Sequence, residues 1–185
     1  MSTTDAKTLI PTGTWVVDPA HSRVGFAVKH MGIATVRGHF NEYEGRLEVG
    51  EDLDHTRAYG TVKTTSVSTD WDQRDEHLRS PDFFDVEQYP ELKFESTKIE
   101  QVDDETFRIV GNLDMHGVTR EITLEAVVDG TDVDPQGNER LGLEVVSQLS
   151  RGDFDMKFNM AMGSGNTVVS DKVKLEIDVS AVKQS

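Results

Sequence analysis

The sequence has no cysteine, little positive charge and no long apolar run. Without cysteine, disulfides, thiolate nucleophiles and cysteine-ligated zinc or iron–sulfur sites are excluded. Its 34 acidic residues against 19 basic ones give a net charge of −15, so a phosphate backbone or an anionic membrane surface is repelled on average. No stretch approaches the ~20 apolar residues of a membrane span. We therefore expect no nucleic-acid partner and no stable membrane anchoring.

The N-terminal residues are polar and show little pattern, which predicts a flexible tail over residues 1–12 and a single domain over residues 13–183. This tail also lacks the basic start and continuous apolar run of a signal peptide. The chain as written is expected to be cytoplasmic.

Alternation of apolar and polar residues predicts antiparallel strands along most of the chain. In the stretch from Asp18 to Gly45, two alternating segments on either side of residues 31–33 predict a long hairpin. The cleanest alternation comes near the end of the chain, where every second residue is apolar and is expected to face inward. Strands of about ten residues with tight turns indicate a closed up-and-down barrel, because closure alone removes both sheet edges. The inward residues of the last strand are Val173, Leu175, Ile177, Val179 and Ala181.

Only one segment has the pattern of a helix, from Trp71 to Arg79. Asp70 is expected to cap it, with Gln73 three residues further on. Trp71 and Leu78 are expected to form one apolar stripe that covers an end of the barrel.

The segment 151–171 is too long and too rich in glycine for an ordinary hairpin turn, yet it carries Phe154, Met156, Phe158 and Met160. Because methionine adapts to irregular apolar shapes, such a segment either fills an imperfect barrel mouth or contacts an apolar ligand. Together with the helix, it is expected to form the movable mouth of a pore.

Three histidines at equal intervals, His21, His30 and His39, raise the question of a metal site. In a hairpin closed around Gly32, His39 lies opposite about Gly25, which leaves it four to five residues, on the order of 13–17 Å, from each of the other two histidines. Ligands of one zinc ion must all lie within about 2 Å of it. We therefore expect no metal site.

The sequence offers little that indicates catalysis. It has no G-x-S-x-G motif, and none of its histidines has a distinctive serine partner by spacing. The titratable residues from Arg74 to His77 fit a solvated helix face, and a catalytic role for them stays open. No catalytic residue is predicted.

Many residues occur together in the order and spacing of one known family. These are Trp15, Asp18, His21, Ser22, Val24, Phe26, His30, Gly38, Phe40, Gly45, Arg74, His77, Leu78, Phe83, Phe84, Asp85, Pro90, Phe94, Ser96, Gly111, Leu113, His116, Gly117, Val118, Thr119, Arg151, Asp153 and Phe154. On these residues the sequence resembles the YceI-like polyisoprenoid-binding proteins, and the resemblance covers residues 13–182. Asp155 departs from the family pattern, which more often has glycine there.

The resemblance implies an all-β, lipocalin-like, eight-stranded antiparallel barrel with one short helix, commonly a homodimer, that holds an isoprenoid chain in an apolar pore. We expect the chain to bind a polyprenyl quinone or polyprenyl phosphate for storage or transport, without a further cofactor. One alternative is an enzyme that acts on such a lipid through Arg74, His77 and His116. Another is a ligand-free structural barrel closed by its own side chains.

The expected binding residues fall into two groups. Apolar side chains on the inward face, the helix and the methionine-rich segment would contact the lipid, and four polar side chains are candidates for its head group. The apolar group is Phe26, Val28, Val36, Phe40, Trp71, Leu78, Phe83, Phe84, Phe94, Leu113, Met115, Phe154, Met156, Phe158 and Met160; the head-group candidates are His30, Arg74, His77 and His116.

Overall fold

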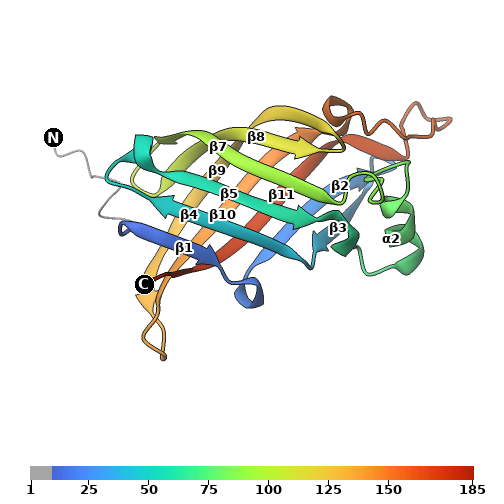
Figure 1. Ribbon diagram of the computed structural model, residues 1–185. Helices are drawn as coiled ribbons and strands as arrows, with labels where there is room; N and C mark the ends of the chain where they lie inside the picture. The colour runs from blue at the N-terminus through green and yellow to red at the C-terminus, as the bar shows by residue number, and fades with distance from the viewer. Residues whose placement is uncertain (1–9) are drawn as a thin grey trace.

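The computed structural model describes residues 10–185, more than half of which form antiparallel strands (Figure 1). Residues 1–9, most of the expected tail, lie outside the described part. One α-helix, α2 (Asp72–Arg79), and four short 3-10 turns, η1 (Pro19–His21), η2 (Leu53–His55), η3 (Thr64–Ser66) and η4 (Arg151–Phe154), occur among the described residues. The strands are β1 (Gly13–Val17), β2 (Arg23–His30), β3 (Ala34–Phe40), β4 (Tyr43–Val49), β5 (Arg57–Lys63), β6 (Val67–Ser68), β7 (Glu91–Gln101), β8 (Thr106–Met115), β9 (Val118–Val133), β10 (Glu139–Ser150) and β11 (Val169–Lys183).

Eight long strands form the barrel, and the first three of them are each interrupted once. The turn η1 separates β1 from β2, residues 41 and 42 separate β3 from β4, and η3 separates β5 from β6. Both halves of each interrupted strand pair with the same neighbouring strand. The first strand (β1 and β2) pairs with the second (β4 and β3), and the second pairs with the third (β5 and β6). The 11 segments of the sheet are therefore eight strand positions.

The last strand closes the barrel. One edge of β11 pairs with β10, and its other edge pairs first with β2 and then with β1, where Val16 lies opposite Val182. Every neighbouring pair is antiparallel and follows chain order. The predicted eight-stranded up-and-down barrel with one short helix is confirmed.

Two local predictions are wrong. The threonine- and valine-rich sequence of residues 57–68 predicts one strand, but this strand is broken at η3. There the buried Thr64 donates its backbone N–H to Pro90 and its hydroxyl to the carbonyl of Tyr89. The helix begins at Asp72, and no side chain caps it. Trp71 is its N-cap residue in an extended conformation, so the helical period does not apply there, and its side chain is 62% exposed instead of covering the barrel.

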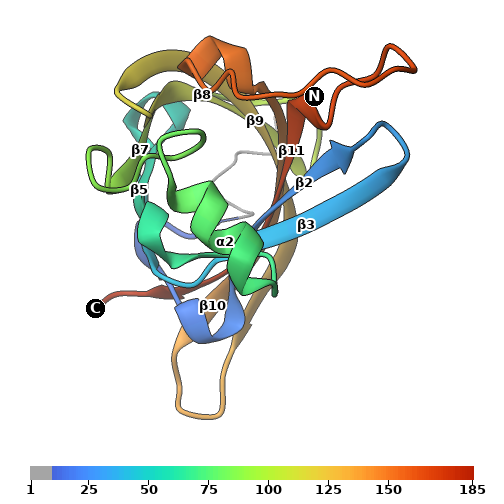
Figure 2. The ribbon, with the colours of Figure 1, turned by 90° about the vertical axis from the view of Figure 1, so that its right-hand side faces the viewer.

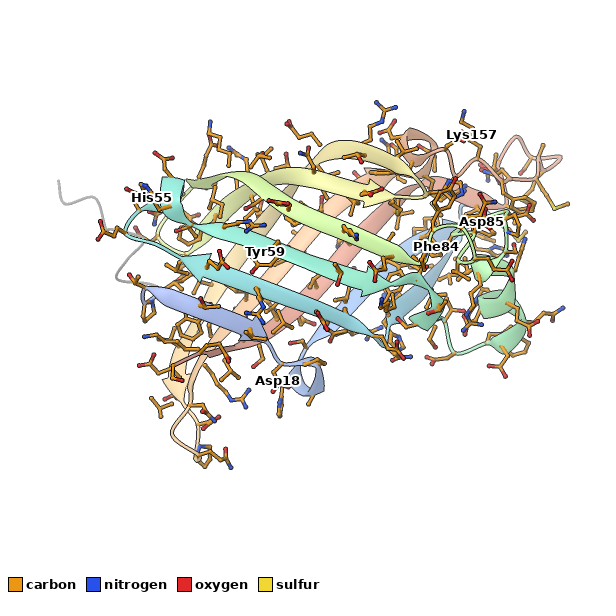
Figure 3. All side chains as sticks on the ribbon, viewed as in Figure 1. Asp18, His55, Tyr59, Phe84, Asp85 and Lys157 are labelled. Atoms are coloured by element: carbon orange, nitrogen blue, oxygen red, sulfur yellow. The ribbon has the colours of Figure 1, made fainter. Side chains whose placement is uncertain are left out.

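Apolar side chains pack in two clusters at opposite ends of the barrel interior. One surrounds Trp15 and Leu141, which are 0% and 1% exposed, and fills the end opposite α2. The other contains Phe83, Phe154 and Met156 and lies at the end that α2 crosses (Figure 2). In Figure 3, His55 marks the first end and Phe84 the second. The interior between them holds the candidate site.

Candidate functional site

A cavity of about 320 Å³ lies inside the barrel, and inward-facing residues of most strands line it. Its size is at the lower end of the roughly 300–1,000 Å³ typical of small-molecule sites. Most of its lining side chains are aliphatic or aromatic. Of the apolar residues predicted from the sequence, those that line it are Phe26, Val28, Phe40, Leu78, Phe83, Phe84, Phe94, Leu113, Met115 and Met156.

Five predicted apolar residues do not line the cavity. Val36 lies on the part of β3 that pairs with β2 alone, beyond the β3–β6 pairing. Trp71 and Met160 are 62% and 59% exposed. Phe154 is 1% exposed and packs in the cluster behind the lining, while the Phe158 ring packs against that of Phe83, 5.3 Å away. Val36, Trp71 and Met160 thus lie away from the cavity. Phe154 and Phe158 belong to the apolar cluster at its α2 end without lining it.

Three aromatic rings form a continuous row along one side of the cavity. The ring centres of Phe26 and Phe40 are 5.7 Å apart, and those of Phe40 and Phe84 are 5.6 Å apart. Tilted and edge-to-face pairs at this spacing are favourable for aromatic rings. Strand β2, strand β3 and the segment after α2 thus contribute to one wall, although this segment is far from the two strands in the sequence.

The last strand lines the cavity, although none of its residues is among the binding residues expected from the sequence. The alternation of β11 predicted its inward residues, and all five line the cavity: Val173, Leu175, Ile177, Val179 and Ala181. The alternation of apolar and polar residues was therefore a signal from which these binding residues could have been predicted.

Arg151 is the one buried charged residue that lines the cavity among residues 10–185, with 6% of its surface exposed. Its guanidinium donates to the backbone carbonyls of Ser170, Met156, Phe158 and Val169, at 2.9, 2.9, 3.2 and 3.3 Å. Burial lowers its pKa from the usual value, although Asp171 opposes the shift. Arg151 therefore fastens the methionine-rich segment to β11 and brings a positive charge to this end of the cavity.

Sequence reasoning did not nominate Arg151 as a binding residue. It stood only among the residues that carry the family resemblance. A lone arginine before a long apolar segment has no spacing pattern that distinguishes a buried position from a surface one.

Asp155, where the family more often has glycine, ends η4 with a φ of 58°, a left-handed conformation that aspartate tolerates better than most residues.

None of the four head-group candidates lines the cavity. His30 is exposed at the end of β2. Arg74 donates to the hydroxyl of Thr69 at 2.7 Å, and His77 Nε2 donates to Asp82 at 2.9 Å. His116 Nδ1 lies 3.0 Å from the carbonyl of Phe154, which can only accept, so Nδ1 carries the proton. Arg74, His77 and His116 therefore have separate structural partners and do not converge on a shared site.

Side-chain hydrogen bonds fasten α2 to the segment before it. The buried carboxylate of Asp75 accepts from both the backbone N–H and the hydroxyl of Thr69, at 2.7 and 2.6 Å. Arg74 donates to the carbonyl of Thr69, and Arg79 to that of Val67. That α2 and the methionine-rich segment move as a mouth stays a prediction, which hydrogen exchange with and without bound lipid would test.

The hairpin geometry predicted for the three histidines is confirmed. His39 pairs with Gly25, and His21 Nδ1 donates to Asp18 at 2.7 Å. Within residues 10–185, no group of three or more histidine, aspartate or glutamate side chains is arranged to hold a metal ion. In the same part of the chain, no helix has the length and apolar character needed to span a bilayer.

The comparisons with known proteins agree with this architecture. The model of the YceI-like domain matches residues 15–181. A UPF0312 protein of Vibrio parahaemolyticus is 35% identical over 173 residues, which cover 92% of this chain and 87% of that protein. The crystal structure of a Campylobacter jejuni YceI protein superposes with a TM-score of 0.71 at 29% identity, over 91% of this chain and 97% of the other. A polyisoprenoid binding domain from Saccharophagus degradans superposes with a TM-score of 0.70 at 15% identity, over 94% and 99%, and shows the shared fold.

Proposed function

The chain belongs to the YceI-like family, and from this premise we propose that it binds an amphiphilic isoprenoid lipid in its central cavity, for storage or transport. The proposed lipid is a polyprenyl quinone or a polyprenyl phosphate. The observation that carries the proposal is the apolar cavity inside the barrel, which residues of both packed clusters line. The Saccharophagus degradans domain, described as polyisoprenoid-binding, has the same fold and supports the same class of ligand.

The energetics of the tail suit a carrier. Transfer of apolar groups from water into an apolar site is favourable by about 0.8 kcal/mol per CH₂, so a long prenyl tail would not stay free in water. A bilayer offers the tail nearly the same environment as the cavity. The net gain over a membrane is therefore small, and the lipid can be released as well as bound.

The charge of Arg151 supports a preferred orientation of the lipid. The guanidinium lies at the α2 end of the cavity, and no carboxylate lies within ion-pair distance of it among the described residues. The opposite end is filled by the cluster around Trp15. We therefore expect the polar head, a phosphate or a quinone carbonyl, at the α2 end and the tail directed toward Trp15.

The two alternative functions have less support. The lipid-modifying enzyme would need Arg74, His77 and His116 in one site, and each of them has a different structural partner outside the cavity. The structural barrel would need an interior filled by side chains, whereas this interior is open. A homodimer and a cytoplasmic location remain part of the proposal, and sedimentation equilibrium would test the first of these.

Tryptophan fluorescence gives a direct test. The chain has two tryptophans, and Trp71→Phe leaves only Trp15, which is fully buried and lines the cavity. A polyprenyl quinone added to this variant should quench Trp15 fluorescence saturably, at one quinone per chain. A quinone without the prenyl tail is the control and should quench only by collision. Equal, non-saturating quenching by both would contradict the proposed function.

A further inference from the structure

The hydrogen-bonded wall of the barrel has a gap between β9 and β10. Their ladder starts at the Glu139–Val133 pair and ends at the Val146–Glu125 pair. Beyond this point, residues 118–124 of β9 pair with β8 alone, and residues 147–150 of β10 pair with β11 alone. The two strands therefore present facing edges that do not pair with each other; we call this gap the β9–β10 split.

An outer groove lies over the split and shares part of its lining with the central cavity. Ile122 of β9 and Leu149 of β10 line both the groove and the cavity. These two residues would face each other if the ladder continued. At this place the wall between the cavity and the outside is only one layer of apolar side chains.

Isolated side-chain hydrogen bonds bridge the split in place of a ladder. The hydroxyl of Ser147 donates to the carbonyl of Thr123 at 2.6 Å, and Arg120 Nε donates to the carbonyl of Asp153 in η4 at 3.0 Å. Ser147 occupies an inward position of β10, between the buried Val145 and Leu149. A polar residue thus interrupts the apolar inward row where the ladder has ended.

The α2 end of the cavity is held by more bonds. Asp75 accepts two hydrogen bonds there, Arg74 and Arg79 each donate two, and Arg151 donates four. Segments that open most readily are those with few backbone hydrogen bonds to break. The split can therefore widen at a smaller loss of hydrogen bonds than the α2 end.

We propose that the β9–β10 split is a lateral port through which the apolar tail of the lipid enters and leaves the cavity, an inference that rests on the proposed function. The tail passes between Ile122 and Leu149, whose flexible aliphatic side chains move apart. The outer groove, which carries Arg108, Arg120 and Lys172 beside Glu121 and Glu125, offers hydrogen-bonding and charged partners to the polar head during transfer. This route leaves the α2 end packed, so it is an alternative to the movable mouth predicted from the sequence.

Stapling the split tests the port. The chain has no cysteine, so Thr123→Cys with Gln148→Cys provides two unique thiols on exposed positions that would face each other across the extended ladder. A short, reducible bis-methanethiosulfonate linker joins them. In the Trp71→Phe background, release of a bound polyprenyl quinone to phosphatidylcholine vesicles is followed by recovery of Trp15 fluorescence. The staple should slow quinone release by about tenfold or more, because opening of the split becomes the rate-limiting step. A reductant, which cleaves the linker, should restore the original release rate.

The matched control is a staple across the β7–β8 seam, where the two strands are paired. Glu95 and Asn112 are exposed partners in this ladder and lie outside the groove, and Glu95→Cys with Asn112→Cys, joined in the same way, should leave release unchanged. Equal release from the stapled and the reduced Thr123/Gln148 variant would overturn the port while leaving lipid binding intact. If the unstapled protein takes up no quinone at all, the proposed function fails and the port fails with it.

Discussion

The ring of Phe26 lies over Gly38, its partner in the β2–β3 ladder, in the space that a Cβ on residue 38 would occupy. Phe94 of β7 lies similarly over Gly111 of β8, the partner of Ser96, and a Cβ on residue 111 would come within 2.5 Å of the Phe94 ring. Both rings line the cavity. Because glycine has no Cβ, Gly38 and Gly111 allow the two aromatic rings to pack close to the strand backbone.

Gly38→Ala should push the Phe26 ring toward the cavity. We expect overpacking to lower the free energy of unfolding by about 1–3 kcal/mol and the displaced ring to weaken quinone binding. Urea unfolding and Trp15 quenching measure the two effects. Gly163→Ala is the control, because nothing lies within 4 Å of a Cβ there, and it should change neither. Wild-type stability and binding in Gly38→Ala would mean that the ring position is not fixed by residue 38.

Phe26→Asp should abolish lipid loading or folding, because it places a carboxylate without a partner in an apolar wall. Lys29→Asp, three residues further along β2, is the matched control. Lys29 is exposed and its ammonium donates to Thr35 at 2.8 Å, so its loss should affect neither property. Circular dichroism and lipid content of the purified variants decide the matter, and equal lipid retention in the two would refute the inward assignment of Phe26.

Much of the barrel could be predicted because alternation is a local signal. The bounds of β8 and β10, the β2–β3 register and the inward row of β11 all follow from residues close together in the sequence. The interruption at η3 could not be predicted in the same way. It depends on hydrogen bonds from Thr64 to residues 89 and 90, which local residue preferences do not reveal.

The site was predictable where it repeats the strand pattern and not where it depends on tertiary position. Phe26 and Leu113 follow the alternation and line the cavity. Trp71 and Met160 are apolar but lie on segments outside the barrel, so composition alone misplaced them. The end of the β9–β10 ladder is marked in the sequence only by the polar Ser147 in the inward row of β10, and one polar residue in such a row does not predict that pairing ends.

The hydrogen bonds of Asp18 should make part of the stability depend on pH. Its carboxylate accepts from His21 at 2.7 Å and from Arg140 at 2.9 Å, and these bonds, His21 first, lower its pKa from 3.8 to about 2. A carboxyl whose pKa is lowered by folding stabilises the folded state above its unfolded-state pKa, and this contribution disappears as the pH falls through the folded-state pKa.

Asp18→Asn should therefore unfold more easily than the wild type above about pH 4, and the difference between the two should shrink toward zero near pH 2. Urea unfolding over this range measures both curves. A difference that stays constant from neutral pH to pH 2 would show that the Asp18 carboxylate does not contribute through its charge.

Arg151→Met should loosen the methionine-rich segment. The substitution keeps an apolar stem but leaves the carbonyls of Met156, Phe158, Val169 and Ser170 without their donor. We expect a loss of about 1.5–3 kcal/mol in the free energy of unfolding and faster amide exchange across residues 156–169. Arg151→Lys, which keeps the charge but not the planar fork, should recover affinity for a polyprenyl phosphate more than it recovers exchange protection. Unchanged exchange in Arg151→Met would contradict the fastening role.

The central claim is that the cavity holds a lipid with a long apolar tail. Its most direct test is organic extraction of the purified, untreated protein, followed by mass spectrometry of the extract and quantitation against protein. The account predicts an isoprenoid lipid with a polar head at close to one molecule per chain, and a much smaller amount from Phe26→Asp that still folds. An extract without isoprenoid lipid, from protein that also fails to take one up from vesicles, would contradict it.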